Sequence, residues 1–558
     1  MTSGTISDSP PQLKSWRRYG PALGLLLILA LVALVRVRLL ALPLERDEGE
    51  YAYAGQLILE GEPPYKLIYN MKMPGIYAAY ALIMAVFGQT PAGIHAGFIL
   101  VNFGAILLLY FVGRRFLEPA GAVVASAIYA VLSLSPNVQG LNAHATHFVV
   151  LAALGGILLL LRALENGRLT GFFWSGVLFG LAFLMKQPGG AFAVFGFSML
   201  VWIAWQQQPV NWKTNALRLT LYSFGVAAPI VLTGLILWRV GVWDRFWWWT
   251  VIYASTHATA LSFSDGMTRL GHYIKGVHWD WSFWILAALG IGFVLIEKAR
   301  AGVKFFFLSF LFFSVAAVCP TWHFTGHYFV LAQPAVALLA ARAWTGVMVK
   351  LTSQPQAFMR QIPCVALGLL FFADLWSHGE VFFKWGPDEA VKRIYPSNDF
   401  QVYPVIADYI RSQSTPSATL AVIGSEPELL FYAHRRSVTG YIYMYDLVQP
   451  QPFRERMEKE MTSEVERGRP DYIVFVNLVF SWTPYSGAYV QEIQNWMTHY
   501  TDSYYEPFGV VTFPPNQYCF QPDCLQLIPP GHRFITIFHR KPGGHSNNKL
   551  VKATDEHR

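Results

Sequence analysis

An acidic cluster follows directly on the first long apolar run of the sequence, at Glu45-Arg46-Asp47-Glu48-Gly49-Glu50. Carboxylates crowded at the end of a helix repel one another, and this repulsion tends to raise the pKa of at least one of them. A carboxylate tuned in this way can act as a general base at neutral pH, which accelerates a reaction by roughly 10²–10⁴-fold. Asp47 and Glu48 are therefore candidate catalytic residues, although acidic residues are also common immediately after a membrane span.

Basic residues at the same membrane level would hold a phosphate group by charge. Lys72 lies in the same loop as the acidic cluster, and Lys186 stands between two apolar runs, where an unpaired charge is costly. Arg36 and Arg38 lie in the outer third of the first apolar run, where they either contact a phosphate or extend to the interface. Together with the carboxylates, these cations indicate attack by an acceptor hydroxyl on a donor whose leaving group is a membrane-anchored phosphate.

Histidines occur in several of the connections that are predicted on the same side of the membrane as the acidic cluster. Near helix ends, hydrogen-bonded structural histidines are more common than functional ones, and no His-Glu-x-x-His motif or neighbouring cysteine pair indicates zinc. These histidines are His144, His147, His257 in a long loop expected at 239–280, His323 and His327.

The composition requires a membrane environment. Of the 558 residues, 54% are hydrophobic and 14% charged, against roughly 25% charged in a soluble domain. The net charge of +8 is explained by basic cytoplasmic loops, so we predict no nucleic-acid partner. Four cysteines exclude a disulfide scaffold, and the spacing of Cys519 and Cys524 leaves their pairing open.

About eleven apolar runs predict membrane spans, although several are shorter than the ~20 residues that cross a bilayer. The first is long and lacks a small-residue cleavage site, which favours an anchor over a signal peptide. A further run at 75–88 is too short to span and is predicted to be interfacial or re-entrant. The predicted spans are 21–44, 94–113, 119–135, 143–161, 171–185, 190–205, 217–238, 281–296, 304–320, 327–347 and 361–377.

The distribution of basic residues orients these spans. With residues 1–19 in the cytoplasm, every inside connection carries lysine or arginine, as the positive-inside rule requires. This alternation needs a break between two spans at Lys186–Gly190. It predicts a transmembrane domain at 20–378 of a multi-pass inner-membrane protein, with the first loop, 45–93, outside.

Residues 379–542 are predicted to form an extracytoplasmic α/β domain. Buried-type strands are expected at 419–424 and 471–477, and helices at 402–413, 426–434 and 452–467. No glycine-rich phosphate loop accompanies the strands, so nucleotide binding has no support. The polar tail 543–558 is predicted to be disordered.

Four sequence elements resemble those of membrane glycosyltransferases related to the protein O-mannosyltransferases (glycosyltransferase family 39), whose bacterial relatives include the lipid A aminoarabinose transferase. The elements cover about residues 20–345 and keep the family's order. Asn70-Met71 and Met73 depart from the family pattern. The element near His147 departs as well, because it has a histidine where many relatives have an acidic residue. These departures put the identity of the sugar and the acceptor in question more than the reaction type. The elements are Asp47-Glu48-Gly49-Glu50-Tyr51, Lys72-Met73-Pro74, Gly180 to Pro188 and Gly326-His327-Tyr328-Phe329.

This resemblance implies a GT-C fold and inverting transfer from a polyprenyl-phosphate sugar to a lipid, glycan or protein acceptor. It implies Asp47 as catalytic base and Lys72 and Lys186 as ligands of the donor phosphate. No cofactor is obligatory in this interpretation, although a divalent metal is compatible with it. The predicted substrate-binding residues are Tyr51, Asn70, His144, His147, His257 and His327.

Two other functions compete with this one. A transporter or flippase of lipid-linked sugars usually places its charges near the midplane and shows internal repeats, whereas here the charges lie at one face. A non-catalytic assembly or receptor protein would act through the outer α/β domain, for which we expect acceptor recognition or support.

Overall fold

A computed structural model describes residues 11–259, 261–276, 280–298, 300–352, 357–482, 487–513, 516–521, 524 and 533–542. The predicted tail, 543–558, lies outside these residues. The chain forms two compact units, the first comprising Met1–Pro64 and Asn70–Pro396, the second Tyr65–Tyr69 and Ser397–Arg558. The sequence placed the boundary at 378/379. It lies at Pro396 because η7 (Glu380–Lys384) and α17 (Pro387–Ile394) belong to the first unit.

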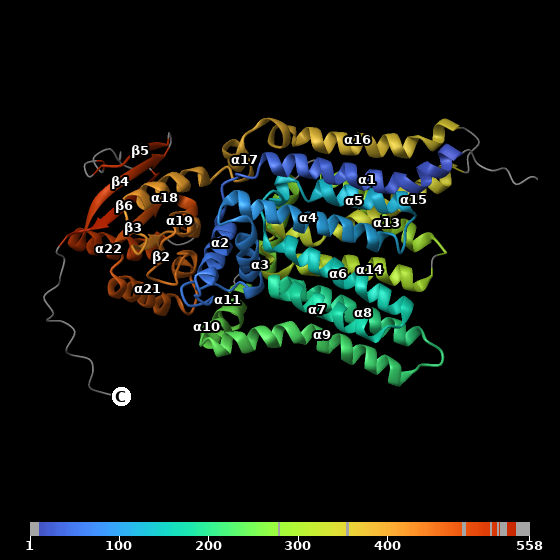
Figure 1. Ribbon diagram of the computed structural model, residues 1–558, viewed down its shortest axis with the longest axis horizontal. Coiled ribbons are helices and arrows are strands. Elements are labelled where there is room, and N and C mark those ends of the chain that lie inside the picture. Colours follow the sequence, from blue (N-terminus) through green and yellow to red (C-terminus); the bar gives the residue numbers. More distant parts are fainter. Residues whose placement is uncertain are drawn as a thin grey trace, which may run out of the picture. The chain divides into compact units, whose positions relative to one another are not determined.

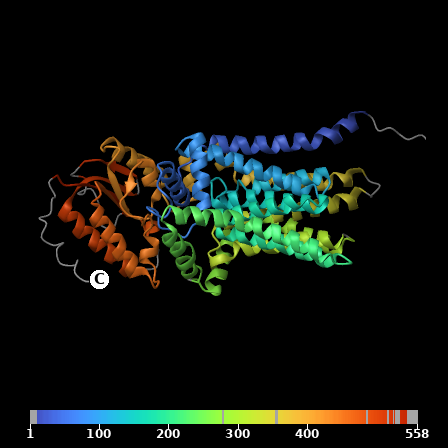
Figure 2. The same cartoon turned by 60° about the horizontal axis from the view of Figure 1, so that its bottom comes forward.

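Long apolar helices run side by side through the first unit (Figures 1 and 2). Each of the predicted apolar spans corresponds to one of these helices, because an unbroken apolar stretch satisfies its backbone hydrogen bonds within itself. They are α1 (Pro11–Arg38), α4 (Pro91–Gly113), α5 (Pro119–Leu132), α6 (Ala145–Asn166), α7 (Leu169–Met185), α8 (Gly190–Gln206), α9 (Trp212–Arg239), α13 (Trp281–Ile296), α14 (Ala301–Val318), α15 (Gln333–Thr352) and α16 (Ile362–Ser377).

Within the described part of the chain, seven helices are long and apolar enough to cross a membrane. An eighth span arises if α12 (Phe263–Gly276) and α13 form one bent span. The remaining predicted spans, α5, α7 and α16, are apolar but only 14, 17 and 16 residues long. Large apolar side chains cover the outer surface of α9, where Phe224 and Trp238 are 65% and 67% exposed, as expected for a lipid-facing helix. The first unit is therefore a polytopic helical membrane domain.

Two short helices, α2 (Arg46–Leu59) and α3 (Pro74–Phe87), lie at one end of the long helices (Figure 1). The Glu45 side chain caps α2 by accepting a hydrogen bond from the Glu48 backbone at 2.8 Å. Pro74 begins α3, where its missing N–H is not needed. The 14-residue α3 corresponds to the predicted short helix at 75–88.

Irregular turns interrupt the helices at the same end. Between α7 and α8, Lys186 is extended and is followed by the single turn η2 (Gln187–Gly189), so the predicted break at Lys186–Gly190 is confirmed. Similar turns are η1 (Pro136–Val138), before α6, and η5 (Gly326–Leu331), before α15. The segment predicted as a long loop at 239–280 is instead largely helical. Its elements are α10 (Trp243–Trp247), η3 (Trp248–Tyr253), α11 (Ala254–Ala258) and α12.

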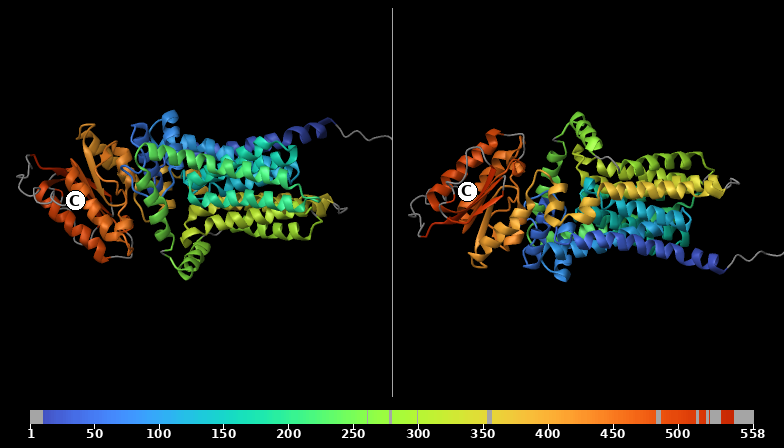
Figure 3. Two further views of the ribbon diagram at one scale, coloured as in Figure 1. Left: turned by 90° about the horizontal axis from the view of Figure 1, so that it is seen from below. Right: turned by 90° about the horizontal axis from the view of Figure 1, so that it is seen from above.

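The described residues of the second unit form a mixed six-stranded sheet in the order β2-β1-β3-β6-β4-β5. β1 pairs in parallel with β2 and β3, while β6 is antiparallel to β3 and β4, and β5 is antiparallel to β4. Helices flank the sheet (Figure 3). The predicted α/β character is thereby confirmed. The strands are β1 (Thr419–Ile423), β2 (Arg436–Ser437), β3 (Tyr472–Asn477), β4 (Tyr505–Phe513), β5 (Gln517–Cys519) and β6 (Arg533–Arg540), and the α-helices are α18 (Tyr403–Ser412), α19 (Pro427–Ala433), α20 (Tyr445–Val448), α21 (Arg454–Gly468) and α22 (Gly487–Tyr504).

A disulfide and a segment from an earlier loop complete the second unit. Cys519 and Cys524, whose pairing the sequence left open, form a disulfide. Five residues from the loop between α2 and α3, Tyr65–Tyr69, also belong to this unit. The Tyr69 backbone donates to the Gly440 carbonyl at 2.8 Å, and its hydroxyl donates to Glu464 at 2.9 Å.

Candidate active site

Asp47 lies in the first turn of α2 and forms an ion pair with Lys72, which stands just before α3. The Lys72 ammonium also lies 2.7 Å from Glu50 Oε2 and 4.8 Å from the centre of the Tyr51 ring. The side chains of Asp47 and Lys72 are 24% and 21% exposed, whereas Glu50 is fully buried. Asp47 is therefore the carboxylate of this group that a substrate can reach.

Glu50 holds Lys72 from the interior of the unit, a role that the sequence analysis did not assign to it. Its carboxylate accepts hydrogen bonds from Asn70 Nδ2 at 3.1 Å and from the Tyr77 hydroxyl. The signal was present in the sequence, because residues three apart on a helix share a face. The predicted site residue Asn70 thus supports the Glu50 carboxylate.

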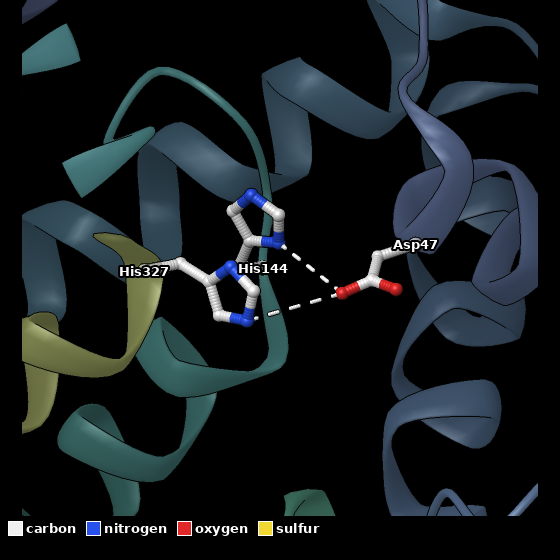
Figure 4. Close-up of side chains that lie close together, drawn as sticks. All are labelled: Asp47, His144 and His327. Atoms are coloured by element: carbon white, nitrogen blue, oxygen red, sulfur yellow. Dashed lines mark ion pairs between the residues drawn. The ribbon is translucent and has the colours of Figure 1, made fainter. Parts of the chain in front are cut away.

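Two histidines approach Asp47 from other parts of the chain (Figure 4). His144 Nδ1 and His327 Nε2 lie 3.8 and 4.0 Å from Asp47 Oδ2, and the two imidazole rings stack at 4.2 Å. His144 precedes α6 and His327 lies in η5, so two distant segments of the chain converge on the Asp47 carboxylate. Both distances exceed hydrogen-bond length, so Oδ2 retains lone pairs for an incoming proton.

Lys186 joins this group through His327. The Lys186 ammonium lies 3.2 Å from His327 Nε2 and 4.2 Å from the centre of the Tyr328 ring. Because an ammonium only donates, Nε2 accepts, and His327 Nδ1 carries the proton that it donates to Gln139 Oε1 at 2.9 Å. Neither Gln139 nor Tyr328 was predicted to take part. Tyr328 directly follows His327 in the sequence, whereas only the tertiary fold brings Gln139 to His327.

The charges of the group follow from burial and neighbours. Burial alone would raise the pKa of Asp47, but Lys72 and His144 outweigh it and hold the pKa well below its usual range. Burial lowers the pKa of Lys186 to about 8. Burial, together with the charges of His144 and Lys186, lowers the pKa of His327. At neutral pH the group therefore contains an ionised Asp47, a neutral His327 and a Lys186 ammonium close to its titration range.

Glu48, predicted as a second catalytic carboxylate, is fully buried on another face of α2. It accepts hydrogen bonds from Asn142 Nδ2 and the Ala143 backbone, each at 2.6 Å, and lies 3.1 Å from His95 Nε2. These contacts join α2 to α4 and to the segment before α6. The Glu48 carboxylate is therefore engaged by protein groups and does not face Oδ2 of Asp47.

Arg36 and Arg38, predicted to bind the donor phosphate, are engaged with protein groups. Arg36 is buried and donates to Asn102 and to the carbonyls of Ser133 and Gly140 at 3.0–3.3 Å. Arg38 donates to the carbonyls of Val381 and Phe382 at 2.6 and 2.9 Å. In this structure neither guanidinium joins the group around Asp47.

Two predicted substrate-binding histidines also lie apart from Asp47. His147 is buried with its ring edge against Phe98, 4.8 Å between centres. His257 stacks on His323 at 5.0 Å. Of the predicted histidines, the structure brings only His144 and His327 to the carboxylate.

Asp47, His144 and His327 also have the geometry of a metal site. One ligand atom from each residue lies within 4.8 Å of the others. One carboxylate oxygen and two imidazole nitrogens suit a divalent cation. Lys72 and Lys186 already place positive charge beside the same atoms, so a metal would compete with these ammonium groups.

Comparison with known proteins agrees with this fold and with the predicted resemblance. Residues 71–238 match the model of a family described as dolichyl-phosphate-mannose-protein mannosyltransferase. This segment includes Lys72, His144 and Lys186. A search of curated protein sequences finds no significant match.

The fold is GT-C-like and is similar to those of two solved proteins. ArnT of Cupriavidus metallidurans, solved with undecaprenyl phosphate, has a TM-score of 0.53 and 13% identity, covering 93% of this chain and 98% of ArnT. The archaeal oligosaccharyltransferase AglB of Archaeoglobus fulgidus, solved with an inhibitory peptide and dolichol-phosphate, has a TM-score of 0.52 and 12% identity, covering 93% of this chain and 76% of AglB.

Proposed function

We propose that this protein transfers a sugar, with inversion, from a polyprenyl-phosphate donor to a lipid, glycan or protein acceptor. The observation that carries the proposal is the convergence of an accessible, ionised Asp47 with the ammonium groups of Lys72 and Lys186. The matched family segment supports this reaction class. The phosphate lipids bound by ArnT and AglB support a polyprenyl-phosphate donor.

The residues have distinct roles in the proposed reaction. Asp47 accepts the proton of the acceptor hydroxyl while the acceptor oxygen bonds to the anomeric carbon from the face opposite the phosphate. The bond between that carbon and the phosphate oxygen breaks, and the lipid phosphate leaves with the electron pair. Lys72 and Lys186 stabilise the charge that develops on this phosphate.

The ion pair between Asp47 and Lys72 couples donor binding to base activation. Lys72 is shared by Asp47 and Glu50. A phosphate draws the ammonium toward itself, which weakens its hold on Asp47 and raises the basicity of that carboxylate. The two lysines supply the charge that the leaving group needs, so the proposed step requires no metal.

The site and the second unit are proposed to lie on the extracytoplasmic side of the inner membrane. Basic residues in alternate connections support this orientation. The disulfide between Cys519 and Cys524 also supports it, because disulfides persist outside the reducing cytosol. We propose that the second unit recognises or supports the acceptor.

The decisive experiment uses the purified full-length protein in detergent, with labelled polyprenyl-phosphate sugars and a membrane glycolipid extract. A transferase releases free polyprenyl phosphate and moves the label to an acceptor, which mass spectrometry identifies. A flippase produces neither change in detergent, where no membrane separates two sides, and would move label only across sealed vesicles. Comparing glycolipids and glycans of wild-type and deletion strains identifies the natural sugar and acceptor.

A further inference from the structure

A second group of ionisable residues lies in the first unit, away from Asp47. It consists of Asp280, which precedes α13, Asp374 in the last turn of α16, and His378, which directly follows α16. One ligand atom of each residue lies within 4.8 Å of the others. Asp280 and Asp374 are 2% and 1% exposed.

The Asp374 carboxylate lacks the partners that burial demands. Neither of its oxygens has a hydrogen-bond partner, although both are removed from solvent. No lysine or arginine among the described residues forms an ion pair with Asp280 or Asp374. The basic partner present is His378, whose Nε2 lies 3.4 Å from Asp280 Oδ1. Two buried carboxylates side by side need a counter-charge or a shared proton.

We propose that Asp280, Asp374 and His378 bind a divalent transition-metal cation. Two carboxylates and one imidazole form a ligand set that suits Zn²⁺ or Mn²⁺, whereas Ca²⁺ and Mg²⁺ prefer oxygen ligands alone. The unpartnered Asp374 oxygens provide lone pairs for the metal. The charge of the cation removes the repulsion between the carboxylates.

Neighbouring groups already orient Asp280 for this task. The Ser135 hydroxyl donates to Asp280 Oδ2 at 2.7 Å, and Asn137 Nδ2 lies 3.4 Å from the same oxygen. Hydrogen bonds of this kind fix the direction of a metal ligand. They leave Oδ1 facing His378.

A cavity of about 400 Å³ borders the group, because His378 and Asn137 line it. Gln139, the partner of His327, lines the same cavity. Ser135, Asn137 and Gln139 all belong to the turn around η1. The metal would therefore join α13 and α16 to the turn that carries Gln139. It would thereby stabilise the turn whose Gln139 contacts His327 of the proposed active site.

The proposal is tested by metal content and thermal unfolding, independently of transfer activity. The full-length protein is purified in detergent without chelator, analysed by mass spectrometry for metals, stripped with EDTA and titrated with Zn²⁺ or Mn²⁺. We expect about one equivalent per chain and a higher Tm with metal. The isosteric variant Asp374→Asn should weaken metal binding by at least about tenfold. Substitution of residues that only hydrogen-bond to metal ligands already lowers affinity by roughly tenfold or more, so loss of a ligand should cost at least as much.

Two further variants assign the bound metal to one group. His144→Ala removes a ligand from the candidate cluster around Asp47, and this variant should still bind one equivalent of metal. His378→Gln should lose the bound metal. If Asp374→Asn does not fold, the wild-type titration and His378→Gln still decide. A wild-type protein that binds neither metal and whose Tm is unaffected by EDTA would overturn the proposal. An Asp374→Asn variant with a raised Tm would also overturn it, because it would show that the two carboxylates share a proton instead.

Discussion

Asp47 and Lys72 form an ion pair in which one carboxylate oxygen is engaged and the other remains open. Oδ1 contacts the ammonium, while Oδ2 faces His144 and His327 at 3.8 and 4.0 Å. The pair thus keeps the carboxylate ionised without filling its lone pairs. This arrangement leads to predictions for both members of the pair and for the residues around them.

Asp47→Asn should reduce kcat by at least about 10²-fold, because an amide cannot accept the proton of the acceptor hydroxyl. The variant keeps the side-chain shape, so expression and thermal unfolding should change little. Glu60→Gln is a matched control at the exposed end of α2 and should keep wild-type kcat. Full activity in Asp47→Asn would refute the role of Asp47 as base.

Lys72→Ala and Lys186→Ala should each weaken apparent donor affinity by roughly tenfold to a hundredfold, since hydrogen bonds to charged groups contribute about 1.5–3 kcal/mol. Donor titration in the detergent assay measures this change. The control Lys66→Ala removes an exposed lysine of the same loop and should leave donor affinity unchanged. Unaltered affinity in both site variants would exclude phosphate contact by these lysines.

Donor binding should depend on pH through Lys186, whose pKa is lowered to about 8. A phosphate favours the protonated amine, so the contribution of Lys186 is complete well below pH 8 and declines as pH rises through that value. Lys186→Arg should abolish this decline, because arginine stays charged throughout the range. Apparent donor affinity measured from pH 6.5 to 9.5 tests the prediction, and identical profiles for the two proteins would contradict it.

Arg36→Met should lower stability without changing donor affinity in the folded fraction. Its side chain satisfies Asn102 and the carbonyls of Ser133 and Gly140 inside the helical unit. Each acceptor left without a partner costs about 1–3 kcal/mol. Thermal unfolding in detergent should show a lower Tm. A raised donor KM at unchanged Tm would instead support the phosphate role predicted from the sequence.

The proposed orientation can be tested with single introduced cysteines. Cys319 and Cys364 are free and would be replaced by serine to give a background without free thiols. A cysteine at position 60 should react with an impermeant thiol reagent in intact cells, and one at position 115 should react only after permeabilisation. The reverse pattern would place the proposed active site in the cytoplasm.

The helical framework could be predicted from the sequence because apolar runs and their polar breaks act locally. The break at Lys186–Gly190 is an example, since an extended lysine followed by Pro188 and glycines ends a helix by local chemistry. The segment 239–280 was predicted as a loop because its short helices, such as α10, lack a long apolar run.

The contacts of the candidate site were less predictable, because they join distant segments. Sequence proximity gave Asp47 and Glu48 equal weight, but the turn of the helix directs one toward Lys72 and buries the other against Asn142. Arg36 and Arg38 bind backbone carbonyls about a hundred or more residues away, which no residue pattern indicates. The partners of a buried cation are set by the tertiary fold.

The loop that carries Lys72 has a further consequence for any attempt to separate the two units. Tyr65–Tyr69 belongs to the second unit, and Tyr69 bonds to Gly440 and Glu464 there. A chain truncated after Pro396 would lose those anchors only three residues before Lys72. Loss of transfer in such a truncation would then have two explanations, a displaced Lys72 or a missing acceptor site. The second unit is therefore better tested by point substitutions on its own surface.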